Sequence, residues 1–491
     1  MTDHSDKLFF RRQYLFGPEP YCPNACWKVQ GFEQGFFLSA HEDVDSYVLS
    51  TSQRSLALIG FFVDPFHPEK SSAEILRGLL DNLSSAADLM ERTAPLGGRW
   101  VLIYKDTDHF LVLNDPCGLR QVYFAGDDNN FWCGSQPEII RQVFDLKRNV
   151  EPLLSSFVKS KGYGWQEGAW VGPGTIWLGC THLLPNHYLC LRRMVVERFF
   201  PVEPLPQVAV PAAVDESARI LKNSIEGMAL RSPLMLPVTA GYDSRVLLAA
   251  SRDSLDRVEC YVDRMGIIEE DHPDVEIPRQ LTASLGLNFS VLNSEERVPD
   301  WFLRLNRINV TRSRNLPKSR MIYARYKDPV AAININGNAS EVCRNFFDKY
   351  LDLVEETLPA SRLAEIFFGE ETDFATREIA AWLKELGDVD PMGYLVLDML
   401  YWEQRMGNWG GHFPAEQDIA LEEFSPFNNR RLMTLLLACP TAMRAAPDFE
   451  LYRQLIQQMW PELLDYPFNP AYSEKLSLRQ RIRTFLGGLR G

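Results

Sequence analysis

Short apolar runs with polar breaks dominate the first 200 residues. Runs rich in β-branched and aromatic side chains, separated by Asp, Asn and Gly, occur at residues 56–62, 99–104, 110–114 and 121–124. A helix is expected over residues 72–83, with Ser71 or Ser72 as its cap. The pattern predicts an antiparallel, sheet-rich first half.

A proline-rich segment ends this pattern. Residues 199–206 read FFPVEPLP, and Pro211 follows. Proline has no backbone N–H, so neither a helix interior nor a central strand accommodates so many. We interpret the segment as a linker or crossover that separates a domain at residues 1–205 from a second domain at residues 206–491.

Strands and helices alternate beyond the linker. Helical periodicity is expected at residues 214–230, 245–250 and 275–285, and strands at residues 234–238, 258–262, 288–292 and 331–335. Such alternation predicts a parallel sheet with helices on both faces. From about residue 361 the chain reads as almost wholly helical. The predicted fold class is therefore α+β followed by α/β.

Charge and composition limit the classes of binding partner that we expect for the chain. The chain has 51 basic and 65 acidic side chains and a net charge of −14. A surface this acidic repels phosphate backbones and anionic membranes, so neither nucleic acid nor a membrane is expected as a partner. The first residues are polar and no apolar run approaches the length of a membrane span, so a cytoplasmic location is expected. Nine scattered cysteines without a CxxC pair argue against structural zinc and a disulfide framework.

The segment LMLPVTAGYDSRVLL carries the candidate chemistry. Its small residues Thr239, Ala240 and Gly241 would let backbone N–H groups approach an anion closely. Ser244 is expected at the start of a helix, where unpaired N–H groups favour phosphate, and Asp243 beside it would suit magnesium. The alternative is a plain strand-to-helix turn capped by Asp243 or Ser244. The segment has neither the Gly-Lys-Ser/Thr ending of a Walker loop nor the three spaced glycines of a dinucleotide fingerprint.

Residues 239–244 resemble the Ser-Gly-Gly-x-Asp-Ser pyrophosphate loop of the asparagine synthetase superfamily, which includes β-lactam synthetases and lasso-peptide cyclases. The segment GNASEVCRNFF, which begins at Gly337, is similar to the family's Gly-Asp/Glu-Gly-x-Asp-Glu segment, and Glu341 falls on its magnesium-binding position. The resemblance implies that Asp243 and Glu341 bind Mg²⁺. It also implies an ATP-binding set of Thr239, Ala240, Gly241, Tyr242, Asp243, Ser244 and Gly337.

Further matches extend the resemblance along the chain. Residues 403–406 look like the family's Asp-Arg-Met turn, and residues 424–432 are similar to its Arg-x-Pro-Phe-Leu-Asp-His-Arg-Leu signature. Residues 97–100, 115–123 and 174–187 resemble segments of the family's glutaminase-type domain. The resemblance implies an N-terminal Ntn-hydrolase-like sandwich, followed by an adenine-nucleotide α-hydrolase-like synthetase domain with C-terminal helices.

Three positions depart from the family or leave a role open. Thr2 stands where glutamine hydrolysis needs a terminal cysteine, so the first domain is expected to lack glutaminase activity. Asn338 replaces an acidic residue and cannot take a proton from an amine at neutral pH. Lys475 lies near the place of the lysine that, in related enzymes, stabilises the charge developing at the adenylate; a lone exposed lysine is an equal alternative.

The resemblance implies an ATP- and Mg²⁺-dependent carbon–nitrogen ligase or cyclase of biosynthesis. It would adenylate a small-molecule or peptide carboxylate, release pyrophosphate and pass the acyl group to a substrate amine, with Glu341, Lys475 and Asn338 as catalytic residues. One alternative is a non-catalytic ATP-binding or regulatory protein on the same fold, which Asn338 and the missing cysteine favour. Another is a tRNA-modifying enzyme with a related loop, against which the acidic charge weighs. The sequence leaves open whether the protein forms a homo-oligomer.

Overall fold

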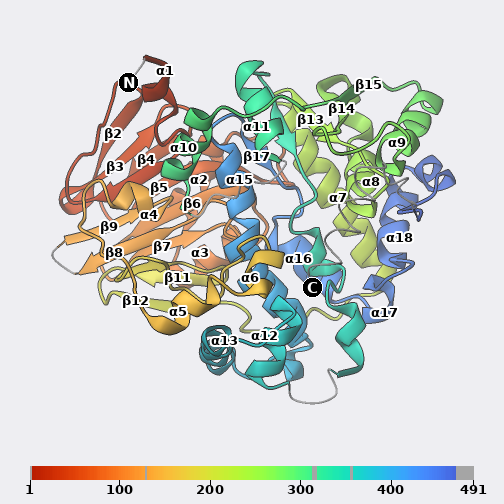
Figure 1. Ribbon diagram of the computed structural model, residues 1–491. Coiled ribbons are helices and arrows are strands. Elements are labelled where there is room, and N and C mark those ends of the chain that lie inside the picture. Colours follow the sequence, from red (N-terminus) through yellow and green to blue (C-terminus); the bar gives the residue numbers. More distant parts are fainter. Residues whose placement is uncertain (1–2, 128–129, 312–317, 354–357, 472–491) are drawn as a thin grey trace, which may run out of the picture.

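The computed structural model describes residues 3–127, 130–311, 318–353 and 358–471. Three sheets organise the chain: two antiparallel sheets in the N-terminal half (residues 1–205) and one parallel sheet in the C-terminal half (residues 206–491). Figure 1 shows the antiparallel sheets in red to yellow on one side of the molecule and the parallel sheet with its green helices on the other. The mixed α+β and α/β architecture expected from the sequence is confirmed.

The two antiparallel sheets have six strands each. The first runs in the order β10 (Cys180–His182), β8 (Tyr123–Asp127), β9 (Asn130–Gly134), β1 (Tyr14–Gly17), β3 (Phe36–His41) and β2 (Trp27–Phe32). The second runs in the order β12 (Val195–Arg198), β11 (His187–Cys190), β7 (Phe110–Asn114), β6 (Gly97–Lys105), β5 (Ser55–Val63) and β4 (Ser46–Ser50). Phe16 of the first sheet and Ile59 and Val101 of the second belong to one buried core, so the sheets are stacked face to face.

Side-chain alternation in β5 explains the layer outside this sandwich. Ile59 faces the other sheet, whereas Leu58 points the opposite way and packs in a second core with Leu76 and Leu79 of α2 (Ser72–Asn82). Ser71 caps α2 in a reciprocal capping box, as expected. The remaining helices of this half are α1 (Asp3–Leu8), α3 (Ala86–Thr93), α4 (Pro137–Ile140), α5 (Pro152–Phe157) and α6 (Lys161–Trp165).

The five strands of the C-terminal half pair in parallel throughout. Their order is β15 (Phe289–Leu292), β14 (Val258–Asp263), β13 (Leu234–Pro237), β16 (Ile333–Ile335) and β17 (Glu423–Phe424). The first helices of this half are α7 (Val210–Ala229), α8 (Tyr242–Ala250), α9 (Pro273–Ser284), α10 (Asp300–Asn309) and α11 (Lys318–Lys327). After them come α12 (Ala360–Phe368), α13 (Asp373–Leu386), α14 (Val396–Met399), a π-helical segment (Leu400–Gly410), α15 (His412–Gln417), α16 (Arg430–Leu437), α17 (Thr441–Arg444) and α18 (Glu450–Met459).

Among the differences from the sequence-based expectation, three bear on the candidate site or on the joining of the halves. Helix α8 begins at Tyr242 and not at Arg245, so Asp243 lies inside its first turn. Helix α7 begins at Val210 and includes Pro211, because the first turn of a helix needs no donor at that position. Strand β17 interrupts a stretch expected to be helical, and two residues are too few to produce a strand pattern.

A buried ion cluster joins the two halves. Arg99 of β6 donates to both carboxylate oxygens of Asp418 at 2.6 and 2.7 Å and to Glu422 at 2.7 Å. Arg120 donates to both oxygens of Glu422 at 3.0 and 3.1 Å. Asn428 strengthens the same seam, since its side chain donates to the Gly98 carbonyl at 2.8 Å. Both arginines belong to the segments that resemble a glutaminase-type domain, and here they hold the C-terminal half in place.

Two further properties concern membrane-spanning helices and cysteine thiols. Within the described ranges, no helix is both long and apolar enough to cross a bilayer. All nine cysteines are free thiols, and all except Cys22 and Cys26 are buried.

Candidate functional site

The candidate site lies at the carboxyl edge of the parallel sheet. Strand β13 ends at Pro237, and the loop beyond it leads into α8, with Gly241 as the N-cap. The neighbouring strand β16 ends at Ile335 and is followed by a 3-10 turn, Ser340–Cys343. The two connections touch, because Ser340 Oγ donates to Asp243 Oδ1 at 2.6 Å. Ligands of open α/β sheets bind in the crevice at this edge.

Gly337 allows this close approach. A Cβ atom placed on Gly337 would lie 2.8 Å from Cβ of Asp243, closer than side-chain atoms pack. Only a residue without a side chain therefore lets the two connections meet at this point. Gly337, expected from the sequence to bind ATP, is brought next to Asp243.

Asp243 and Glu341 share one counter-charge, Arg344. Its Nη2 lies 2.9 Å from Asp243 Oδ2 and 3.7 Å from Glu341 Oε1. Burial raises the pKa of Glu341 and nearby Asp243 raises it further, whereas Arg344 opposes the shift. The carboxylates that the sequence assigned to magnesium are thus close enough to repel one another, and a guanidinium partly relieves the repulsion.

The chemistry of this pair fits a magnesium ion that also contacts phosphate. Mg²⁺ takes hard oxygen ligands and is commonly held by one or two carboxylates together with substrate phosphates. Asp243 and Glu341 supply two such groups, each with about a quarter of its side chain exposed, at 24% and 25%. No third Asp, Glu, His or Cys joins them in the described part of the chain. Arg344, which sequence analysis assigned no role, carries the positive charge that such an ion would otherwise supply.

The backbone amides of residues 239–241 are already hydrogen-bonded to side chains of the protein. Thr239 N donates to Ser244 Oγ at 3.1 Å, and Gly241 N donates to Thr239 Oγ1 at 3.2 Å. Ala240 N donates to Asp274 Oδ1 at 3.0 Å. Each of the three loop N–H groups therefore already donates to an oxygen atom of the protein. The first turn of α8 has further amides without helical acceptors, which is the general property that makes helix N-termini attract anions.

Asp274, near the start of α9, also contributes to the site. An aspartate in the first turn of a helix commonly acts through capping or the helix dipole, but here His272 is the N-cap and its ring accepts from Asp274 N. The Asp274 carboxylate instead reaches across to the loop amide of Ala240. No local pattern could reveal this contact, because it depends on how α9 packs beside β13.

The side chain of Tyr242 packs in the core, so only its backbone is available for the binding role expected from the sequence. The ring is 5% exposed and stacks on Phe468 at a centroid distance of 4.2 Å and an angle of 5°. Buried Arg245 fixes the same partner segment by donating to the carbonyls of Leu463 and Tyr466 at 3.0 and 3.2 Å.

The segment after α18 reaches the loop at Asn469, whose N–H donates to the Ala240 carbonyl at 3.1 Å. Lys475, six residues further along the sequence, lies outside the described residues, as does Thr2. The assigned roles of both therefore stay predictions.

Asn338 lies beside a buried polar network. Its Nδ2 atom is buried without a hydrogen-bond partner, and its backbone N–H donates to Asn336 Oδ1 at 3.0 Å. Behind it, Asn334 and Asn336 donate to the two oxygens of Glu423 at 2.9 and 2.5 Å. Burial raises the pKa of Glu423 to about 8, although these hydrogen bonds oppose the shift. Glu423 therefore holds its proton near neutrality, and nothing in the sequence marked it because it lies on the short strand β17.

The other two matched segments reach both the candidate site and the seam. Arg405 opposes the raised pKa of Glu341, and Ser425 Oγ donates to the Asn338 carbonyl. Glu403, fully buried, accepts from Arg198 at 2.5 and 2.8 Å, from Asn186 at 3.0 Å and from Trp382 at 2.7 Å. The Asn428 side chain bonds Gly98 and Asp115 of the N-terminal half. Residues 403–406 and 424–432 thus contribute to the seam between the halves.

Comparisons with known proteins reveal little similarity. No protein-family model and no curated protein sequence matches the chain. One similar solved structure is the glutamine phosphoribosylpyrophosphate amidotransferase from B. subtilis complexed with ADP and GMP, with 12% identity, 60% of this chain and 87% of that chain covered, and a TM-score of 0.25. Another is described as the allosteric regulatory enzyme of purine biosynthesis, with 13% identity, 48% and 56% covered, and a TM-score of 0.26. Likeness at this level establishes neither a family nor an activity.

Proposed function

We propose that the chain is an ATP-dependent ligase that activates a carboxylate as an acyl-adenylate and transfers the acyl group to an amine without hydrolysing glutamine. One observation carries the proposal: Asp243 at the start of α8 and Glu341 after β16, almost 100 positions apart in the sequence, converge at the carboxyl edge of the parallel sheet around Arg344. A paired carboxylate site beside a helix N-terminus suits a magnesium-bound polyphosphate.

The chemistry divides into two displacements. An oxygen of the substrate carboxylate attacks the α-phosphorus of ATP and pyrophosphate leaves; an amine then attacks the acyl carbon and AMP leaves. The amides of residues 239–244 would bind pyrophosphate after releasing Ser244 Oγ and the Asp274 carboxylate. Asp243 and Glu341 would hold Mg²⁺, which supplies neutralisation of phosphate charge.

Asn338 would position the amine. Its unpartnered Nδ2 is a donor, and its Oδ1 can accept from an amine N–H. Because an amide cannot take a proton at neutral pH, the amine would have to bind deprotonated or lose its proton to another group. In this proposal the stacked sheets of the N-terminal half are an Ntn-hydrolase-like sandwich without glutaminase activity, and the parallel-sheet half is the adenine-nucleotide α-hydrolase-like synthetase.

ATP–pyrophosphate exchange tests the proposal. The purified full chain, with Mg²⁺ and pools of carboxylic acids, is expected to exchange labelled pyrophosphate into ATP with one pool. Asp243→Asn should lower the exchange at least about 100-fold, because electrostatic contributions of this kind are worth several kcal/mol. Asp300→Asn, at an aspartate whose side chain is 72% exposed, is the matched control and should exchange normally. Equal exchange in both variants would exclude the assigned site.

A second candidate function is non-catalytic nucleotide binding or regulation. It is favoured by the ion pairs and hydrogen bonds that already satisfy the groups of the candidate site. Arg344 already pairs with both carboxylates, and the three loop amides already have protein acceptors. Equilibrium binding separates the two functions. Binding of Mg-ATP without exchange for any acid, even with amines added, would support the regulatory function, whereas exchange would exclude it.

A further inference from the structure

A pocket of about 830 Å³ lies at the seam between the halves, and neither the loop at residues 239–244 nor Glu341 contributes to it. Its walls come from α3, from β11 and β12, from the proline-rich segment 199–206 and from α16. Most of the wall is apolar or aromatic, with Met90, Leu111 and Phe200 among the lining residues. The volume falls within the range of small-molecule sites.

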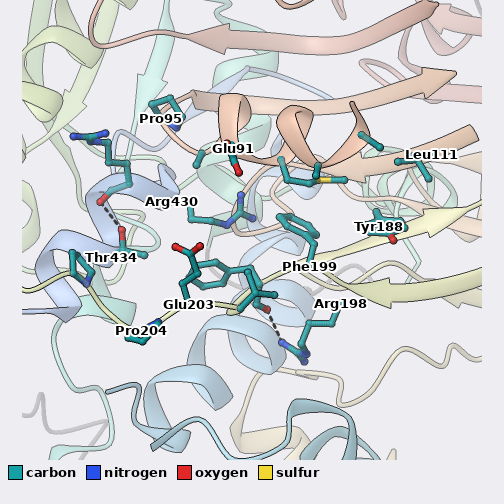
Figure 2. A pocket seen from close by; sticks show the side chains of 18 of the residues that line it. Glu91, Pro95, Leu111, Tyr188, Arg198, Phe199, Glu203, Pro204, Arg430 and Thr434 are labelled. Carbon is teal, nitrogen blue, oxygen red and sulfur yellow. Dashed lines mark hydrogen bonds between the residues drawn. The ribbon is translucent and has the colours of Figure 1, made fainter. Parts of the chain in front are cut away.

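Arg430 enters this pocket as a buried cation. Figure 2 shows it beside Phe199, and its guanidinium carbon lies 4.7 Å from the Phe199 ring centroid and 5.3 Å from that of Phe200. Only 4% of Arg430 is exposed. Nη2 donates to Asn186 Oδ1 at 3.2 Å, whereas Nε has no hydrogen-bond partner. Within the described ranges, Arg430 forms no ion pair.

The other two arginines of the pocket wall differ in this respect. Arg198 pairs with Glu403 at 2.5 Å and with Glu385 at 2.5 Å. Arg431 pairs with Glu216 at 2.6 Å and is half exposed. The protein therefore neutralises two of the three guanidinium groups and leaves the most buried one without a carboxylate.

An unpaired buried cation is costly, because it loses its hydration without gaining a counter-ion. Burial lowers the pKa of Arg430 to about 10, which leaves it charged at neutral pH. A guanidinium offers parallel N–H donors that match the two oxygens of a carboxylate. The exposed carboxylates of Glu91 and Glu203 also line the pocket and would repel a ligand with several negative charges.

We propose that this pocket binds a monocarboxylate with a flat apolar body, whose carboxylate pairs with Arg430 and whose body packs against Phe199, Phe200 and Met90. The site is additional to the proposed nucleotide site and does not depend on it. No covalent step is involved.

Isothermal titration of the full chain tests this site with phenylacetate as the probe. Phenylacetamide, which has the same shape without the charge, and inorganic phosphate, which has the charge without the apolar body, are the comparison ligands. Saturable one-to-one binding of phenylacetate is expected, at least about tenfold tighter than either comparison ligand, because a charge-assisted hydrogen bond contributes about 1.5–3 kcal/mol.

Three variants localise the binding. Arg430→Gln can still donate to Asn186 and should weaken binding about tenfold or more. Ala87→Trp alters an exposed residue of α3 that lines the pocket and should block it by volume alone, so it tests the site even where Arg430→Gln fails to fold. Arg431→Gln, which removes a paired arginine from the same wall, should change binding by less than about threefold.

The outcomes are decisive in each direction. Loss of binding in Arg430→Gln or in Ala87→Trp, with retention in Arg431→Gln, supports the site. No binding of phenylacetate, equal binding of phenylacetamide or phosphate, unchanged affinity in a folded Arg430→Gln, or unchanged affinity in Ala87→Trp overturns it.

Discussion

At the scale of single residues, Arg344 decides how the carboxylate pair behaves. With Arg344 in place, the pair Asp243 and Glu341 is partly neutralised without a metal. Arg344→Met should cost about 1–3 kcal/mol of unfolding free energy, since the groups are only partly buried and solvent screens part of the charge. Millimolar Mg²⁺ should then raise the melting temperature of the variant more than that of the wild type.

Thermal unfolding with and without Mg²⁺ measures this effect. The double variant Arg344→Met with Asp243→Asn removes one of the two like charges and should lose the additional magnesium response. The same response to Mg²⁺ in the wild type and in Arg344→Met would show that Arg344 does not take the place of a cation.

Gly337 gives a second prediction at this scale. Gly337→Ala places Cβ 2.8 Å from Asp243 Cβ, so the two connections must move apart. We expect a loss of about 1–3 kcal/mol, the usual cost of forcing an extra methyl group into a packed site. Gly31→Ala, where an added Cβ meets nothing within 4 Å, should change stability by no more than about 0.5 kcal/mol. Urea unfolding compares the two, and equal effects would mean that contact with Asp243 is not the constraint.

At the scale of elements, the pairing of β16 with β17 buries an acid that keeps its proton. The pKa of Glu423 is about 8 when folded, against a usual value of 4.5. The folded state therefore binds one more proton than the unfolded state between these values. The corresponding stability is complete below about pH 4.5 and is lost as the pH rises toward 8, by at most about 1.4 kcal/mol per pH unit.

Glu423→Gln removes this titration while keeping the size of the side chain. The slope of unfolding free energy against pH between 5 and 8, from urea titrations, should become more positive by up to about 1.4 kcal/mol per unit. The amide must accommodate one unfavourable contact with Asn334 or Asn336, which should lower stability at low pH by about 1 kcal/mol. An unchanged slope would show that Glu423 is ionised in the folded protein.

Elements with a strong local pattern were predictable, and those defined by distant partners were not. The strand expected at residues 110–114 is β7, and α2 begins at Ser72 after its Ser71 cap, because alternation and capping are local signals. Strand β17 exists only because β16 lies beside it, so its two residues carry no periodicity.

The same distinction applies to the candidate site. Asp243 and Glu341 could be proposed from short motifs, and the structure brings them together. Arg344 lay inside the matched segment but had no counterpart there to give it a role. The contact between Asp274 and Ala240 depends on the packing of α9, which no local spacing encodes.

At the scale of the whole molecule, α16 connects the seam pocket to the candidate site. It begins at Arg430 in the pocket, and its Met433 carbonyl lies 3.9 Å from Cys343 Sγ at the end of the turn that carries Glu341. The same residue contacts the N-terminal half, where Cys117 Sγ lies 4.0 Å from Met433 Sδ. A ligand in the pocket would therefore bind against an element packed on both halves.

We expect the ion cluster around Arg99 to contribute to the joint unfolding of the two halves. Arg99 is 2% exposed and neutralises both Asp418 and Glu422. Without Arg99, Asp418 would keep Arg120 as an ion-pair partner only at 3.7 Å, and removing one partner from a buried cluster typically costs about 3–5 kcal/mol. Arg99→Met should therefore lower the unfolding free energy by this amount and divide the calorimetric transition into separate transitions of the two halves. Arg193→Met, at an arginine whose side chain is 61% exposed, should change stability by no more than about 0.5 kcal/mol.

A second substitution distinguishes lost charge balance from lost packing. In Arg99→Met with Asp418→Leu, the carboxylate that depends most on Arg99 is gone, while Glu422 keeps its bonds to Arg120. Apolar replacements of a buried ion pair are often neutral or stabilising. This double variant should recover at least about half of the loss and restore a single calorimetric transition. If it is instead as unstable as Arg99→Met alone, the shape of the arginine at the seam, and not its charge, holds the halves together.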